Sequence, residues 1–166
     1  MNTKIKKLRS FLTFVLFLLC ILYIERVTFR ISIVQGESME ETLDDSDLLF
    51  VWLLSDVDRY DIVIVDKDDL DYLIIKRIVG VPGDTVQIID GYLYINGELA
   101  EDDIYGKEVI NDAGIAEDPV VLGDGQYFVL GDNRNNSADS RYIGLIGEDE
   151  IMGVVKFRFY PNWTFF

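Results

Sequence analysis

The stretch "TVQIIDGYLYING" at positions 85–97 holds two short apolar runs, joined by the pair Asp90-Gly91. Its Val, Ile and Tyr residues are those that strands favour. An Asp-Gly pair suits the two-residue type I′ turn that joins neighbouring antiparallel strands, because both of its residues tolerate a positive φ. The stretch therefore predicts a β-hairpin with strands at 84–89 and 92–95.

Six further runs of the same kind lie on either side of this hairpin, separated by turn residues. They are "RISIV" (30–34), "DLLFVWLL" (47–54), "DIVIVD" (61–66), "YLIIKRIVGV" (72–81), "QYFVLG" (126–131) and "IMGVVKFRFY" (151–160). The runs do not alternate with helical patterns, so the strands should pair mainly antiparallel. We expect one mainly β domain over residues 27–166, with the acidic, weakly periodic stretch 98–125 as a surface excursion whose acids are solvated.

The N-terminal segment predicts a membrane anchor. Its apolar run "FLTFVLFLLCILYI" occupies positions 11–24 and follows four basic residues, Lys4, Lys6, Lys7 and Arg9. A cleaved secretory signal peptide has the same beginning, but the residues after this run lack a small-x-small exit. We therefore expect an uncleaved transmembrane signal anchor at 10–26, a cytoplasmic basic tail at 1–9 and an extracytoplasmic domain, in a single-pass protein of the cell membrane.

Composition excludes several kinds of chemistry. The 166 residues contain 15 Lys+Arg and 30 Asp+Glu, a net charge of −15 that disfavours binding to nucleic acid. Histidine is absent, which excludes Ser-His and Cys-His mechanisms. The single cysteine, Cys20, allows neither an intrachain disulfide nor a thiolate cluster for zinc. We expect no metal and no cofactor, and hydrolytic chemistry would have to use carboxylates, hydroxyls or a lysine.

Two interpretations of "VQGESMEETLDDSD" (34–47) stand side by side. Ser38 and Glu41 have the spacing of a capping box, in which each side chain bonds a backbone N–H at the start of a helix. Alternatively, Ser38 is a nucleophile. This stretch alone does not decide between them.

A lysine lies within the apolar run 72–81. Strand alternation places Tyr72, Ile74, Lys76 and Ile78 on one face and Arg77 on the other. Lys76 could extend to water from an edge strand or pair with a carboxylate. Alternatively, burial lowers its pKa, and the neutral amine can then take a proton from a serine hydroxyl.

The polar stretch "VLGDNRNNSADSR" (129–141) follows an apolar strand and has the composition of a solvated turn. It could also support a buried amine. Its charged residues can form charge-assisted pairs, and its serines can hydrogen-bond a lysine. These residues are Asp132, Arg134, Asp139 and Arg141, with Ser137 and Ser140.

Four segments in this order resemble those of the type I signal peptidases, the membrane-anchored Ser/Lys endopeptidases. They are "GESMEETL" (36–43), "RYDIVIV" (59–65), "IKRIVGVPGD" (75–84) and "GDNRNNSADSR" (131–141). The resemblance implies Ser38 as the nucleophile and Lys76 as the general base. It also implies Ser137 as a hydrogen-bond partner of the lysine, and Asp139, Arg141 and Asp132 as supports of the last segment.

The resemblance implies further that the substrates are the signal peptides of secreted preproteins, bound as an added strand. Shallow apolar pockets would select small residues before the cut, and their expected lining is Val34, Met39, Ile74 and Ile75. The implied partners are the lipid bilayer and the secretion translocon. We expect Trp163, Phe165 and Phe166 at the membrane interface and Trp52 in the core.

The chain departs from the family pattern at three positions. Glu41 stands where the family usually has Pro, and Tyr60 where it has Gly in Arg-Gly-Asp. Gly36 replaces a hydroxyl residue that some relatives use as a second oxyanion donor, which leaves that donor undetermined.

Three other functions remain as alternatives. The first is a peptidase of the same type with a dedicated client such as a pilin. The second is an assembly factor on a peptidase scaffold, which should have lost Ser38 or Lys76. The third is a penicillin-binding hydrolase, but its Ser-x-x-Lys motif would need a lysine where Glu41 stands.

Overall fold

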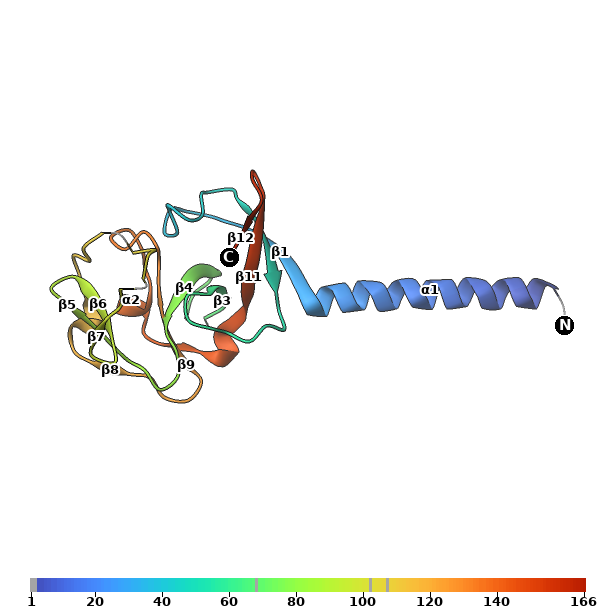
Figure 1. Ribbon diagram of the computed structural model, residues 1–166. Coiled ribbons are helices and arrows are strands. Elements are labelled where there is room, and N and C mark those ends of the chain that lie inside the picture. The colour runs from blue at the N-terminus through green and yellow to red at the C-terminus, as the bar shows by residue number, and fades with distance from the viewer. Residues whose placement is uncertain (1–2, 68, 102, 107) are drawn as a thin grey trace.

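The structure is a computed structural model that describes residues 3–67, 69–101, 103–106 and 108–166. Residues 1 and 2 of the predicted tail, and 102 and 107 of the predicted excursion, lie outside these ranges. A long helix, α1 (Thr3–Thr28), projects from a β domain (Figure 1). It contains the predicted anchor 10–26, and its segment Lys6–Thr28, with a mean hydropathy of 2.0, is long and apolar enough to cross a membrane.

The β domain contains two sheets whose neighbouring strands all pair antiparallel. Each of the eight predicted runs forms a strand, so the mainly β, antiparallel prediction is confirmed. The larger sheet has the order β1 (Phe29–Ile33), β2 (Leu48–Trp52), β11 (Ile151–Tyr160), β3 (Ile62–Val65), β4 (Ile74–Gly80), β9 (Gln126–Leu130) and β10 (Ile146–Gly147), with β12 (Thr164–Phe165) beside β11. The smaller sheet has the order β7 (Glu98–Leu99), β6 (Tyr92–Ile95), β5 (Thr85–Ile89) and β8 (Val120–Val121). Three short helices, η1 (Gly114–Glu117), α2 (Ser140–Ile143) and η2 (Glu148–Glu150), complete the described elements.

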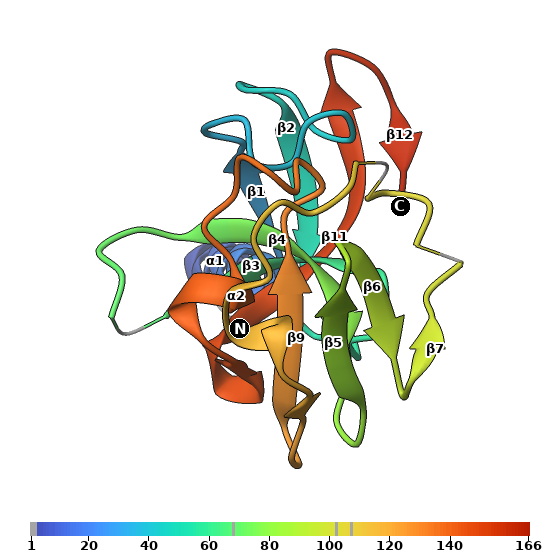
Figure 2. The same cartoon turned by 90° about the vertical axis from the view of Figure 1, so that its left-hand side faces the viewer.

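The hairpin at Asp90-Gly91 forms as predicted, and it joins β5 to β6 (Figure 2). Both turn residues have a positive φ, 52° and 81°, as a type I′ turn requires. The same chemistry recurs at Asn96-Gly97, where φ values of 55° and 82° allow β6 to turn into β7. That second turn was not predicted, although its residues carry the same signal.

The stretch 98–125 is only partly a surface excursion. Most of its described acids are exposed, as expected. Ile110, Ala116 and Leu122 are buried, however, and pack in the core between the smaller sheet and β9. The prediction is wrong at these positions, because isolated apolar residues in an irregular segment fill a core without any periodicity that would reveal them.

The larger sheet places β4 in its interior. Neighbouring β3 is buried on both faces, with Ile62 and Ile64 in one core cluster and Val63 and Val65 in another. β4 pairs with β3 on one side and, from Arg77 onward, with β9 on the other. Lys76 lies just before the pairing with β9 begins, but its side chain is buried, so the interpretation in which it extends to water is wrong.

Candidate active site

Ser38 lies in the loop between β1 and β2. The loop is closed where the backbone of Val34 bonds to Asp47 and Ser46. Residues 38–42 form turns rather than a helix, and the Thr42 and Leu43 N–H groups both donate to the Met39 carbonyl. The buried side chains of Met39 and Leu43 anchor this turn in the core and leave Ser38 half-buried at its surface.

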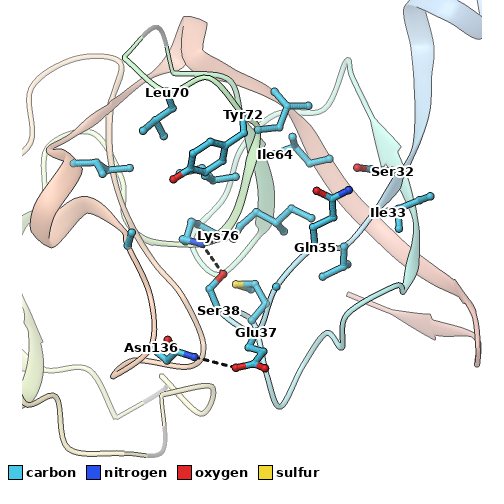
Figure 3. Close-up of a pocket in the computed structure, with 18 of the residues that line it drawn as sticks. Ser32, Ile33, Gln35, Glu37, Ser38, Ile64, Leu70, Tyr72, Lys76 and Asn136 are labelled. Atoms are coloured by element: carbon cyan, nitrogen blue, oxygen red, sulfur yellow. Dashed lines mark hydrogen bonds between the residues drawn. The ribbon is translucent and has the colours of Figure 1, made fainter.

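Lys76 reaches Ser38 from β4. Its Nζ lies 2.8 Å from Ser38 Oγ (Figure 3). Nζ also donates to the Ile75 carbonyl oxygen at 2.9 Å. The lysine is 3% exposed and shares a strand face with Ile74 and Ile78, as alternation predicted. The fold thus brings together two groups that are 38 residues apart in the chain.

Burial lowers the pKa of the Lys76 ammonium from 10.5 to about 8. The negative charges of Asp139 and Asp132 oppose this shift but do not cancel it. Removing an ammonium from water disfavours its charged form, whereas nearby carboxylates favour it. About a tenth of the molecules would therefore carry a neutral amine at neutral pH.

Asp132 joins the turn that carries Ser38 to β4, the strand that carries Lys76. Its carboxylate binds the Arg77 guanidinium through two bonds of 2.6 and 2.8 Å and also accepts the Thr42 hydroxyl at 2.6 Å. The Arg77 and Asp132 side chains are both almost completely buried. Arg77, the other basic residue of β4, is thus paired with a carboxylate, whereas Lys76 lies close to Ser38.

Asp139 and Arg141 form a buried pair within the last segment, with two bonds of 2.8 Å. Asp139 also accepts the Gly131 N–H and caps α2 by accepting the N–H of Arg141. The Arg141 guanidinium donates to the carbonyl of Arg134 at 2.5 Å and to that of Asp112 at 3.1 Å. Through these bonds the pair connects Gly131 and Arg134 to the end of the polar stretch 129–141. The resemblance implied this supporting role for Asp139 and Arg141.

Ser137 and Ser140 were predicted to hydrogen-bond Lys76, but neither does. Ser140 Oγ is buried and accepts the Val129 N–H at 2.9 Å. Ser137 Oγ is also buried, and it has no hydrogen-bond partner among the described residues. The predicted bond from Ser137 to Lys76 is therefore not formed here, since Nζ is directed at Ser38 and the Ile75 carbonyl.

An open groove of about 900 Å³ runs past Ser38. One wall is formed by residues 30–39 and the other by residues 72–76, with Leu70, Asn136, Ala138 and Ile143 beside them (Figure 3). The four predicted pocket residues, Val34, Met39, Ile74 and Ile75, all line it. Across the described residues, no group of three His, Cys, Asp or Glu side chains is arranged to hold a metal ion.

The departure at Tyr60 has a structural counterpart. Tyr60 has a φ of 73°, a conformation that glycine adopts without strain and other residues rarely adopt. Its carbonyl accepts a bond of 2.7 Å from Arg77, and its ring lies 6.1 Å from that of Tyr105. Tyrosine therefore keeps the backbone geometry for which glycine is suited and adds an aromatic contact.

Several contacts of the site were missing from the sequence-based prediction. Asp103 pairs with Arg134, Tyr105 covers the Arg77 guanidinium at 3.4 Å, and the Asn133 N–H donates to the Ser38 carbonyl. A buried arginine demands an acidic partner. With 30 acidic residues in the chain, however, the sequence does not say which one supplies it.

Known proteins share this sequence and fold. The model of the family described as "Signal peptidase, peptidase S26" matches residues 7–160. Signal peptidase I of Bacillus licheniformis is 39% identical over 155 residues, which cover 84% of this chain and 81% of the relative. Signal peptidase I T of Bacillus subtilis strain 168 is 40% identical over 162 residues, which cover 89% and 82%.

A crystal structure of a signal peptidase I from Enterococcus faecalis V583 matches with a TM-score of 0.52 and 31% identity, over 60% of this chain and 97% of that one. The family match spans most of the chain, and it includes the Ser38 turn, the Lys76 strand and the last polar loop. The chain belongs to the signal peptidases of peptidase family S26.

Proposed function

We propose that Ser38 and Lys76 form the catalytic dyad with which this signal peptidase, a serine endopeptidase, removes signal peptides from exported preproteins. The observation that carries the proposal is the 2.8 Å separation of Lys76 Nζ and Ser38 Oγ at the floor of an open groove. A serine hydroxyl is a weak nucleophile until a base removes its proton. In this histidine-free chain, the buried amine is the base within hydrogen-bonding reach.

The chemistry proceeds through an acyl-enzyme. The neutral Lys76 amine takes the proton of Ser38 as Oγ attacks the scissile carbonyl, and the resulting ammonium returns a proton to the leaving amine. The C–N bond breaks, and the signal peptide remains attached to Ser38 as an ester. Lys76, neutral again, then activates a water molecule that hydrolyses this ester.

The Ser38 N–H is the first candidate for stabilising the oxyanion that develops on the substrate carbonyl. Gly36 offers no side-chain donor. Its φ of +90° suits glycine, and the space where a Cβ would stand is open. A second donor would therefore have to come from a position other than the side chain at 36.

The groove suits a substrate bound as an extra strand. β1 is the first strand of the larger sheet and pairs with β2 on one side, while its other side borders the groove. Ile74 and Ile75 of β4 pair with β3 and border the groove before the pairing with β9 begins at Arg77. An extended peptide between these two strands would bind by main-chain hydrogen bonds, with Val34, Met39, Ile74 and Ile75 forming its apolar pockets.

The pH dependence of cleavage tests the role of Lys76. Because the amine must be neutral to accept a proton, kcat/KM should rise about tenfold per pH unit below pH 8 and level off above it. The pKa of about 8 for Lys76 sets this inflection. The measurement is kcat/KM for a labelled precursor in detergent from pH 5.5 to 9.5, over the range in which the folded enzyme persists. A profile that is flat across pH 8 would remove Lys76 as the base.

An aromatic surface supports contact of the domain with the bilayer. Phe50 stacks on Phe29, the residue that follows α1, and on Phe157, with ring centroids 5.0 and 4.7 Å apart. Trp163 and Phe165 lie beside Phe157 and are 69% and 75% exposed. Aromatic rings are favoured at membrane interfaces. Trp52, expected in the core, is also exposed.

The orientation follows from the basic residues that precede the anchor, which should remain in the cytoplasm. In wall-free cells, an external protease should digest the β domain and leave a tag at the N-terminus protected until the membrane is permeabilised. Digestion of the tag in intact cells would reverse the proposed orientation.

A further inference from the structure

The polar loop that ends near Ser38 is fastened by a buried arginine that the mechanism above does not use. Arg134 binds Asp103 through two bonds of 2.8 Å, and its Nε donates to the Gly131 carbonyl at 3.0 Å. The side chains of both ion-pair partners are almost completely buried, at 1% and 5% exposure. Gly106 packs so closely on the guanidinium that a Cβ there would collide with it.

Asp103 belongs to a strap, which we define as residues 103–106 and 108–112 of the former excursion. The strap contacts two further buried arginines, Arg77 and Arg141. Tyr105 covers the Arg77 guanidinium, and the Asp112 carbonyl accepts a bond from Arg141. Asn135 of the loop bonds Glu108 and Val109 of the strap. The strap and the polar loop thus form one hydrogen-bonded unit.

The loop in turn holds the nucleophile. The Asn133 N–H donates to the Ser38 carbonyl at 3.1 Å, and the Asn133 side chain donates to the Glu37 carbonyl at 3.1 Å. Gly131 lies against the Ser38 carbonyl with no room for a Cβ. These contacts hold the peptide groups on both sides of Ser38, and with them the direction in which Ser38 Oγ points.

We infer that Asp103 is a positioning residue for the catalytic dyad, an inference that rests on the proposed function of Ser38 and Lys76. Asp103 holds the Arg134 guanidinium, Arg134 holds the Gly131 carbonyl, and the turn from Gly131 to Arg134 holds Ser38. Without the carboxylate, the guanidinium would keep its charge and lose its partner in a buried place, which favours rearrangement of the turn. Misplacing a nucleophile by about 1 Å is enough to slow a reaction about 100-fold.

The test is the single-turnover cleavage of a labelled precursor by Asp103→Asn, with the enzyme in saturating excess. Asparagine keeps the shape of the side chain and removes its charge. We expect the rate to fall at least about tenfold, with the enzyme concentration for half-maximal rate unchanged within about twofold. Partial unfolding would lower the amount of active enzyme and leave the saturated rate intact, so this readout separates positioning from stability.

Asp84→Asn is the matched control. It removes the charge of another buried aspartate that pairs with an arginine, Arg59, away from the groove. Asp84→Asn should melt earlier than wild type and keep its saturated rate. Arg134→Lys tests the same link from the other partner. Lysine keeps the positive charge but cannot form the two parallel bonds that the guanidinium makes with Asp103. It should slow the reaction as Asp103→Asn does, and the double variant should be no slower than the slower single variant.

The inference would be overturned if Asp103→Asn and Arg134→Lys both kept a saturated rate within twofold of that of the wild type. Equal slowing by Asp84→Asn would overturn it as well, because this result would show that the effect is not specific to the contacts between Asp103 and the polar loop. Ser38→Ala in the same series keeps the two proposals apart. If Ser38→Ala cleaves normally, the dyad is wrong, whereas an inactive Ser38→Ala beside an unimpaired Asp103→Asn rejects the role of Asp103 alone.

Discussion

Replacing Ser38 with alanine is expected to leave a secreted precursor uncut and to lower the rate of cleavage by at least about 10⁴-fold. The variant lacks the oxygen that forms the acyl-enzyme, while the groove and the turn around Met39 and Leu43 remain. The precursor should therefore still bind. The measurement is precursor trimming in cells that depend on this enzyme, together with kcat/KM for the purified variant.

Ser55→Ala serves as the control, because Ser55 is a half-buried serine outside the groove and the polar loop. It should trim the precursor at the wild-type rate. Binding of an uncleaved precursor to Ser38→Ala, measured by co-purification, shows that the site is intact. Trimming by Ser38→Ala at the wild-type rate would mean that another residue attacks the carbonyl.

The strands of this fold could be predicted because the signal for each one is local. The runs at 61–66 and 151–160 are rich in β-branched and aromatic residues, and they form β3 and β11 almost residue for residue. The order of the strands is not local. β11 lies between β2 and β3, which are adjacent in the sequence, and the periodicity of β11 contains nothing that assigns it this place.

Ser38 and Lys76 were predicted as a pair because four segments resemble those of the signal peptidases in the same order. The lysine in an apolar run and the absence of histidine made such a pair possible but left other interpretations open. That Lys76 and Arg77 would both be buried was not predicted. Alternation puts them on opposite faces, and segments distant in the sequence cover both: Ser38 contacts Lys76, while Asp132 and Tyr105 contact Arg77. The partners of the arginines come from distant segments, Asp132 for Arg77 and Asp103 for Arg134, and no spacing rule connects them.

Replacing Lys76 with methionine is expected to abolish cleavage and, at the same time, to stabilise the fold. The pKa of Lys76 falls from 10.5 to about 8 on folding, so the unfolded chain binds this proton more tightly. Below pH 8 this costs the folded state about 3 kcal/mol, and the cost disappears as the pH rises from 8 to 10.5. Methionine has a similar volume and no charge to bury. It also loses the bonds to Ser38 and the Ile75 carbonyl, worth about 1 kcal/mol in total.

We therefore expect Lys76→Met to be more stable than wild type by about 2 kcal/mol at pH 7 in chemical denaturation, with no detectable cleavage. The advantage should shrink as the pH rises toward 10, because only the wild type regains stability there. Lys156→Met, at a half-buried lysine of β11, should show neither effect. A destabilised and inactive Lys76→Met would point to a structural ammonium. The combination of higher stability and lost activity would show that the buried amine is kept at the expense of the fold because the reaction needs it uncharged.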